Sequence, residues 1–316
     1  MIKILKLKLL LFLIPIFVLS FLAMPVLAAE LYIDTSRNEY GAGNIFIANL
    51  KIDVQGECVN AVKADISFSN DLLEAVDFVK SDSILIFWVE EPVIDQARGM
   101  VSFAGGVPGG YCGKISQGSD FDNLIGKMVF KAKGENLQKA ESKMAEIKFI
   151  DSSEVFLNDG LGTKTTLAGQ GLRLKITAGT GLTEDEWQRE KSGDNIPPET
   201  FKVELEKDSL IFDEKYFIVF SAFDKQTGIG RYEVKEGKGQ WKEAVSPYLL
   251  ADQSLKGAIA VKAIDKAGNE RLGEVNFSES KYKPQARIPA KLFFALIVLI
   301  IGGFWMIKFV NKKLIK

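Results

Sequence analysis

Histidine is absent from the 316-residue chain, and this absence removes several classes of function. Histidine is the commonest general base in enzymes and the commonest metal ligand in proteins. Serine–histidine catalysis, cysteine–histidine catalysis and histidine-ligated zinc sites are therefore excluded. The chain also lacks a phosphate-binding loop, a dinucleotide-binding glycine motif and a cluster of metal-ligand residues. We expect neither a cofactor nor a bound metal.

The acidic residues do not supply a convincing catalytic pair either. A glycosidase needs two carboxylates that flank a sugar at set distances. Glu90 and Glu91 are neighbours in a predicted strand, so their side chains point to opposite faces. Asp120 and Asp122 lie in a polar loop, where solvated carboxylates are common. We predict that the protein is not an enzyme; catalysis without histidine is the alternative.

Basic residues are scarce outside the two ends of the chain. Three lysines precede residue 9 and five lie at or beyond residue 291, whereas neither end carries an acid. Residues 29–290 therefore hold 32 basic and 41 acidic residues, a net charge of −9. This balance disfavours nucleic acid as a partner, because its binding requires basic surfaces.

Residues 1–28 have the composition of a secretory signal peptide. A basic start is followed by an apolar stretch that ends in small residues at Ala28 and Ala29. We expect cleavage after Ala28 or, as a second choice, after Ala29. An uncleaved membrane anchor is the alternative, although Pro15 and Pro25 interrupt the stretch.

Residues 292–307 form an apolar run without a charge near the C-terminus. With the next three residues, it would reach about 28 Å as a helix, which spans a bilayer core. Four lysines lie beyond residue 307, at positions 308, 312, 313 and 316, and the positive-inside rule places such residues in the cytoplasm. We predict a transmembrane helix over residues 290–310 and a cytoplasmic tail over 311–316, with residues 29–289 outside the cell. A buried core helix is the alternative, but the run has no polar face.

Cysteine occurs only at positions 58 and 112, both in the acidic middle of the chain. An even number of cysteines in an exported domain indicates a disulfide, which we expect to join Cys58 to Cys112. If the strands alternate in direction, both cysteines lie at the same end of a sandwich. The bridge would stabilise the domain by about 4 kcal/mol on the chain-entropy model.

The middle of the chain alternates apolar and polar residues with the period of a β-strand. In residues 44–54, Phe46, Leu50 and Ile52 point to one face, and Lys51 points to the other. Comparable runs predict about nine strands in an antiparallel sandwich. The other runs are residues 31–34, 62–68, 72–78, 84–89, 99–104, 124–133, 144–150 and 172–176.

The order of these runs resembles the cohesin domain, the receptor module of bacterial cellulosomes. The resemblance rests on three motifs and covers residues 30–178. They are the strand 62–68 that ends in an aromatic before a short turn, the run Leu73-Glu74-Ala75-Val76, and the strand end Phe130-Lys131-Ala132-Lys133. It implies that residues 29–178 form a nine-stranded jelly-roll sandwich that docks a dockerin-type protein partner on a flat face. Because carbohydrate-binding modules share this fold, a polysaccharide is the other partner that the resemblance implies.

Residues 84–89 carry more apolar side chains than one buried face requires. Phe87 and Trp88 point to opposite sides, so we expect one ring in the core and the other in solvent. The predicted binding surface lies around Phe87, Trp88 and Tyr111. Coverage of both rings by a glycine-rich loop over residues 105–113 is the alternative.

Residues 179–198 are predicted to form a linker. Within it, Thr183 and Glu186 have the spacing of a capping box, which favours a short exposed helix up to Lys191. Residues 199–280 are predicted to form a smaller β domain, in which Trp241 lies in the core. Residues 281–289 would then form a membrane-proximal stalk.

The end of the second domain resembles bacterial immunoglobulin-like surface repeats. The resemblance rests on the run Ala263-Ile264-Asp265-Lys266-Ala267-Gly268-Asn269. Asp265 and Asn269 suit a plain turn, and a calcium site is the less favoured alternative.

Two functions of different classes are compatible with these features. The first is a membrane-anchored cell-surface binding protein for a dockerin-type module or a polysaccharide. The second is a passive structural stalk that spaces other components from the membrane. Exposed aromatic residues on one face of the sandwich would favour the first, and a uniformly charged surface would favour the second.

Overall fold

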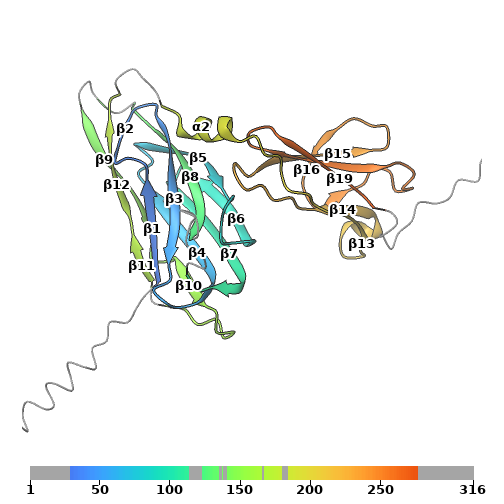
Figure 1. The fold of residues 1–316 in the computed structure, drawn as a ribbon, viewed down its shortest axis with the longest axis horizontal. Helices are drawn as coiled ribbons and strands as arrows, with labels where there is room; N and C mark the ends of the chain where they lie inside the picture. The colour runs from blue at the N-terminus through green and yellow to red at the C-terminus, as the bar shows by residue number, and fades with distance from the viewer. Residues whose placement is uncertain are drawn as a thin grey trace, which may run out of the picture. The chain divides into compact units, whose positions relative to one another are not determined.

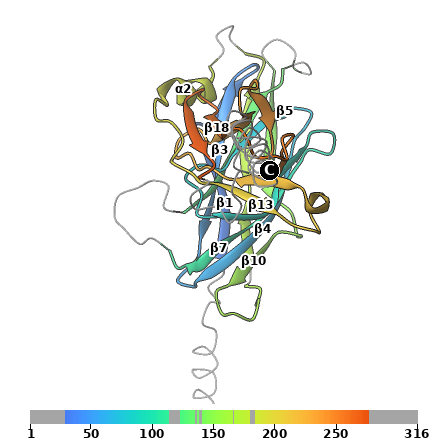
Figure 2. The same ribbon diagram turned by 90° about the vertical axis from the view of Figure 1, so that its right-hand side faces the viewer.

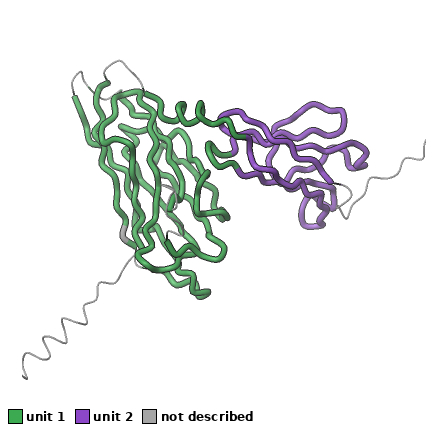
Figure 3. Tube along the Cα trace, viewed as in Figure 1, with its two compact units in different colours: residues 1–196, 224–228 green, residues 197–223, 229–316 purple. Residues whose placement is uncertain are grey.

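The computed structural model describes residues 29–113, 123–134, 137, 141–165, 167–179 and 184–276. The predicted signal peptide, stalk, transmembrane helix and cytoplasmic tail lie outside these residues. Within the described ranges, no helix is long and apolar enough to cross a bilayer. The chain divides into two compact units, which Figure 3 colours separately. Unit 1 comprises residues 1–196 and 224–228, and unit 2 comprises residues 197–223 and 229–316.

Unit 1 is a jelly-roll β-sandwich, as the sequence predicted (Figure 1). Its first sheet has the strand order β11-β1-β3-β8-β5. Its second sheet has the order β2-β12-β9-β4-β7-β6, and β10 also pairs with β4. The strands are β1 (Ala29–Thr35), β2 (Glu39–Gly41), β3 (Ile45–Asp53), β4 (Val59–Phe68), β5 (Leu73–Val79), β6 (Phe87–Asp95), β7 (Met100–Tyr111), β8 (Leu124–Ala132), β9 (Ser142–Phe149), β10 (Glu154–Leu157), β11 (Leu167–Gln170) and β12 (Leu172–Thr177).

The core of unit 1 lies between the two sheets and follows the predicted alternation. In β4, Val62, Ala64 and Ile66 are buried, and the residues between them are partly exposed. From the other sheet, Phe46 and Phe130 stack with their ring centroids 5.8 Å apart. Because every second side chain enters this layer, one face of each sheet remains directed outward.

The strand count and two boundaries differ from the sequence prediction. Unit 1 has twelve described strands rather than nine, because β2, β10 and β11 have only three or four residues each. Strand β6 begins later than predicted and extends to Asp95. The predicted glycine-rich loop over residues 105–113 is wrong: β7 continues to Tyr111, and Gly105 and Gly106 pair with β4 and β6.

Strand β6 forms an irregular edge of the second sheet. It pairs with β7, and the register shifts between Trp88 and Glu90 and again between Glu90 and Val93. Pro92 lies within the second irregular stretch. On the far side of β4, the hairpin that follows β10 extends beyond the sandwich (Figures 1 and 2).

The disulfide between Cys58 and Cys112 is confirmed. Their Cα atoms are 4.0 Å apart, and the neighbouring residues Val59 and Tyr111 are register partners in β4 and β7. The bridge therefore joins the ends of two adjacent strands, at one end of the sandwich as predicted.

The helix in the predicted linker exists, but it is docked rather than exposed. Helix α2 (Glu186–Gly193) is capped by Asp185, whose side chain accepts a hydrogen bond from the Gln188 amide at 2.7 Å. The predicted capping residue Thr183 lies outside the described residues. Trp187 is buried, which ties the helix to unit 1.

Unit 2 contains seven strands in two sheets, ordered β13-β14-β17 and β16-β15-β18-β19. Ile218, Phe220 and Val261 are among its core residues. Its immunoglobulin-like character remains a prediction. The strands are β13 (Val203–Lys207), β14 (Tyr216–Phe220), β15 (Ile229–Glu236), β16 (Lys242–Ala244), β17 (Tyr248–Leu249), β18 (Ile259–Asp265) and β19 (Glu270–Glu274), and a short helix η1 (Phe212–Glu214) precedes β14.

The side chains of Trp241 and Asp265 bear on two predictions made for unit 2. The prediction that Trp241 lies in the core is wrong, because the ring is partly exposed beneath the ammonium groups of Lys235 and Lys262. Asp265 accepts hydrogen bonds from the Gly268 and Asn269 amides and from the Asn269 side chain. These bonds are those of an aspartate-stabilised turn.

Candidate functional site

Helix α2 covers part of the outer face of the first sheet in unit 1. Trp187 packs against Ile47 of β3, Val129 of β8 and Val79 of β5. The ammonium group of Lys127, which is buried on β8, lies 3.2 Å from a carboxylate oxygen of Glu190. This face therefore already holds an intramolecular helix.

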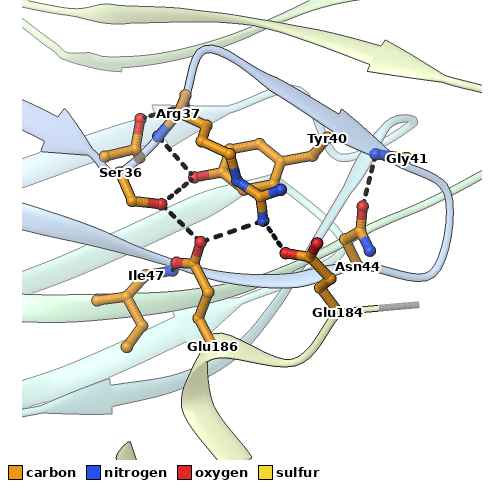
Figure 4. A network of polar contacts seen from close by, with 9 residues as sticks. Ser36, Arg37, Tyr40, Gly41, Asn44, Ile47, Glu184 and Glu186 are labelled. Atoms are coloured by element: carbon orange, nitrogen blue, oxygen red, sulfur yellow. Dashed lines mark hydrogen bonds and ion pairs between the residues drawn. The ribbon is translucent and has the colours of Figure 1, made fainter. Parts of the chain in front are cut away.

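Polar contacts fix the start of this helix (Figure 4). The buried carboxylate of Glu186 accepts hydrogen bonds from the Ile47 amide at 3.1 Å and from the Ser36 hydroxyl at 2.6 Å. Arg37 forms ion pairs with both Glu184 and Glu186. The Ile47 amide thus donates its hydrogen bond to Glu186 instead of to a neighbouring strand. If the helix detached, this buried amide would lose its acceptor, which costs free energy.

The outer face of the second sheet consists of two chemically different parts. On β12 and β9, charged side chains neutralise one another. The Glu146 carboxylate forms ion pairs with Arg173 and with Lys148, each at 3.2 Å. Lys175 forms an ion pair with Glu39 of β2, also at 3.2 Å. Charges that are already paired offer little to a partner, so this part has the properties of a solvated surface.

The part formed by β4, β7 and β6 carries small side chains instead. Gly106 of β7 lies between Ala61 of β4 and Phe87 of β6 in the register of the sheet. One row further along, Ala104 lies between Lys63 and Glu90. We call the four residues Ala61, Ser102, Ala104 and Gly106 the small-residue surface. Because nothing longer than serine projects from these positions, a partner can approach the backbone of β7 and the adjacent part of β4.

Apolar side chains border the small-residue surface along β6. Phe87 is 61% exposed and Val93 is 62% exposed. Both are register partners of small-residue positions, Gly106 and Ser102 respectively, so both project from the outer face. On the opposite border, Phe156 of β10 is paired with Ala61 and is partly exposed. Neighbouring strands lie about 4.8 Å apart, which places the two phenylalanine positions about 14 Å apart.

Two charges on this part are available to a partner. Among the described residues, neither Lys63 nor Glu90 has an ion-pair partner. Their neighbours do: Glu154, opposite Lys63, pairs with Lys164, and Glu91 pairs with Lys80. The two positions flank Ala104 and are two strand spacings apart, about 10 Å. The surface therefore presents one positive and one negative group on either side of its centre.

The structure separates the three predicted binding residues. Phe87 lies on the outer face. Trp88 is turned inward and partly buried, with its ring centroid 5.5 Å from Phe103 and 5.9 Å from Phe78. Tyr111 is buried, so its prediction as a surface binding residue is wrong, because β7 carries it into the core beside the disulfide.

Sequence reasoning did not identify the small residues as part of the site. Ala61, Ala104 and Gly106 carry no chemical signal of their own, and their importance depends on their alignment across β4 and β7. The pairing of Glu91 with Lys80 at 2.6 Å, which leaves Glu90 unpaired, was also not predictable from adjacent acids.

No family model matches the chain, and no curated protein matches it. Among solved structures, the chain is similar to a cohesin module of a family 33 glycoside hydrolase from Clostridium perfringens, with 15% identity over 48% of this chain and 97% of that chain and a TM-score of 0.35. It is similar to a non-cellulosomal cohesin from the archaeon Archaeoglobus fulgidus, with 12% identity over 48% of this chain and 91% of that chain and a TM-score of 0.36. It is also similar to the cohesin of a type I cohesin–dockerin complex from Clostridium thermocellum, with 11% identity over 47% of this chain and 94% of that chain and a TM-score of 0.36. The similarity is to a cohesin-like fold over about half of the chain.

Proposed function

We propose that unit 1 is a protein-docking module that binds a dockerin-type partner on the small-residue surface, within a protein anchored in the cell membrane. The observation that supports this proposal is the combination of two exposed apolar side chains, Phe87 and Val93, with four adjacent small residues. Solvent exposure of a phenylalanine is costly, and a partner that covers it recovers this free energy.

The surface has the features of a protein-binding site rather than of a general sticky patch. Apolar anchors beside a flat centre let a partner exclude water around one or two large side chains, which dominate most interface energies. Lys63 and Glu90 supply charges of opposite sign at fixed positions. Such charges contribute to orientation and selectivity more than to affinity.

A polysaccharide is the second candidate partner. Sugar rings stack on exposed aromatic side chains, and Phe87 offers one such ring. Phe156 is less available, because the ammonium group of Lys164 lies 5.8 Å from its ring centroid. One fully available ring supports a protein anchor better than it supports a row of stacked sugars.

The experiment measures binding of the fragment 29–276 to a panel of recombinant dockerin modules and to cell-wall and plant polysaccharides. Dockerins are the first probes because the Clostridium thermocellum structure is a complex with one. Phe87→Ala should weaken binding by about 2 kcal/mol, or roughly thirtyfold. Ala104→Arg should abolish it, because the long side chain would occupy the centre of the surface.

The matched control is Met144→Ala. Met144 is 60% exposed on β9 of the same sheet, but it lies in the ion-paired part. This variant should bind as the parent does. The proposal is wrong if no dockerin binds, or if Phe87→Ala and Met144→Ala bind alike. Binding of polysaccharides alone would favour the second candidate, and no binding at all would favour the structural stalk.

A further inference from the structure

The loop between β13 and β14 in unit 2 exposes two large apolar residues. Leu210 is 93% exposed and Ile211 is 42% exposed. They lie in residues 208–215, which connect β13 to β14 at one end of the first sheet of the unit (Figure 1). A short connection between antiparallel strands normally carries polar residues, so the composition of this loop requires an explanation.

The backbone is strained directly after the two exposed residues. Phe212, Asp213 and Glu214 have φ angles of 57°, 52° and 59°, a left-handed conformation that non-glycine residues rarely adopt. Three successive residues of this kind persist only where the surroundings hold them. Asp208 supplies part of this restraint, because its side chain accepts the Leu210 amide at 2.7 Å and its carbonyl accepts the Glu214 amide at 3.1 Å.

Phe212 supplies the rest of the restraint. Its ring contacts Phe217 of β14, with centroids 5.5 Å apart, and covers an outward position of the sheet. The loop therefore packs its third apolar residue and leaves the first two in solvent. A loop built only to connect two strands would gain by packing all three.

The last described residues of unit 2 run toward this loop. Val275, next to the last described residue, forms a parallel bridge with Val203, the first residue of β13. Parallel strands run in the same direction, so residues 275–276 head toward the end at which β13 enters the loop. The apolar run over residues 292–307 begins sixteen positions after Asn276.

We propose that Leu210 and Ile211 insert into the interface of the bilayer that anchors residues 292–307, which gives unit 2 a second contact with the membrane. This inference rests on the proposed membrane anchorage. Apolar side chains at the boundary between head groups and acyl chains contribute to binding in proportion to the area they bury. Because three acids, Asp208, Asp213 and Glu214, outnumber Lys215 in the loop, the attraction is apolar, and a zwitterionic lipid is the appropriate probe.

The experiment places a polarity-sensitive fluorophore on the loop of the full chain reconstituted in phosphatidylcholine liposomes. The chain has two cysteines, which form the disulfide, so Leu210→Cys introduces the one free thiol. The matched control is Leu161→Cys, which replaces another exposed leucine, 84% accessible, in the hairpin of unit 1. Spin-labelled phosphatidylcholine should quench the probe at position 210 at least about twofold more strongly than the probe at 161.

A second variant tests whether the contact is apolar. Ile211→Asp, combined with the probe at position 210, should reduce the quenching to the level seen at 161. Flotation of the liposomes distinguishes failure of the membrane anchorage from failure of the loop contact with the bilayer. If the chain does not float with the liposomes, the anchorage and this inference both fail. If it floats, but the probe at 210 is as accessible to water as the probe at 161, this inference alone is overturned.

Discussion

Replacing Trp187 by alanine tests whether α2 is an integral part of unit 1 or a loosely attached linker. The indole is only 6% exposed and packs against Ile47, Val79 and Val129. The helix has eight residues, which is too short to be stable by itself in water. Its presence therefore depends on the sandwich, and Trp187 provides the apolar part of that attachment.

The magnitude follows from what the substitution removes. A tryptophan buries roughly 150–250 Å², and truncation of a buried tryptophan costs about 3–5 kcal/mol. The lower end applies here, because a surface helix can detach and let water reach its site, so no empty cavity remains. We expect the free energy of unfolding of unit 1 to fall by about 3 kcal/mol.

The assay is urea-induced unfolding of the fragment 29–276, followed by hydrogen exchange in the peptide that covers β3. This peptide reports on the Ile45 and Ile47 amides. In the folded state the first donates a hydrogen bond to the Glu184 carbonyl oxygen and the second to the Glu186 carboxylate. A protease should also cut near α2 more readily in the variant. The matched control is Trp241→Ala, which removes the same side chain from a partly exposed site in unit 2 and should leave β3 unaffected.

Two results would contradict this reasoning. One is a loss of no more than about 0.5 kcal/mol for Trp187→Ala, the range of ordinary surface substitutions. The other is protection of the Ile47 amide that survives the substitution, because Glu186 would then hold the helix without the indole. Either result would mean that polar contacts, rather than apolar burial, attach the helix.

Three further predictions concern the disulfide, one carboxyl group and the topology. Replacing Cys58 and Cys112 together by serine should lower the free energy of unfolding by about 4 kcal/mol in urea titrations, because the bridge closes a loop with a sequence separation of 54. Burial raises the pKa of Asp82, and nearby Lys127 opposes this shift. The folded state thus holds the proton more tightly, so the group stabilises the fold below its unfolded pKa and loses this contribution as the pH rises through its folded pKa. Asp82→Asn should therefore raise Tm at pH 7, and calorimetry should show this gain vanishing below about pH 4; a gain that persists in acid would contradict the assignment. Asparagine also tolerates the φ of 58° at this position. Protease added to intact cells should remove residues 29–289 and spare the C-terminal tail, whereas a protected ectodomain would refute the proposed anchorage.

The sequence predicts the long strands of unit 1 because their alternation extends over many residues. In β4, ten residues alternate almost without interruption, and the register follows from the position of Val62 and Ile66 in the core. β2 and β10 have three and four residues, too few for a period of two to be distinguished from chance. They form because the neighbouring strands present unpaired edges.

The docking of α2 could not be predicted from its pattern. Its one large apolar residue is Trp187, so the helix has no apolar stripe. Similarly, the residues around Gly105 resemble a loop in sequence. In the structure Gly105 lies in a strand, where a Cβ atom would be in tight contact with Leu85, at 3.0 Å, and with the Phe87 carbonyl oxygen, at 3.1 Å.

The choice between Phe87 and Trp88 likewise depended on three-dimensional context. Alternation places them on opposite sides, but it does not say which side is the core. The register of β6 against β7 decides this, because it places Trp88 opposite Gly105 on the inner face and Phe87 opposite Gly106 on the outer face. The small-residue surface follows from the same register and was therefore also beyond the reach of the sequence.

The irregular edge at β6 has a consequence for crowded conditions. An incoming strand can extend a sheet only where successive amide and carbonyl groups present a regular ladder. Two register shifts, the second of which contains Pro92, interrupt that ladder. Neighbouring copies at high density therefore cannot fuse their sheets into a continuous filament through this strand. Each copy retains its own accessible Phe87 and Val93, although these side chains lie on the strand from which fibrous growth would otherwise start.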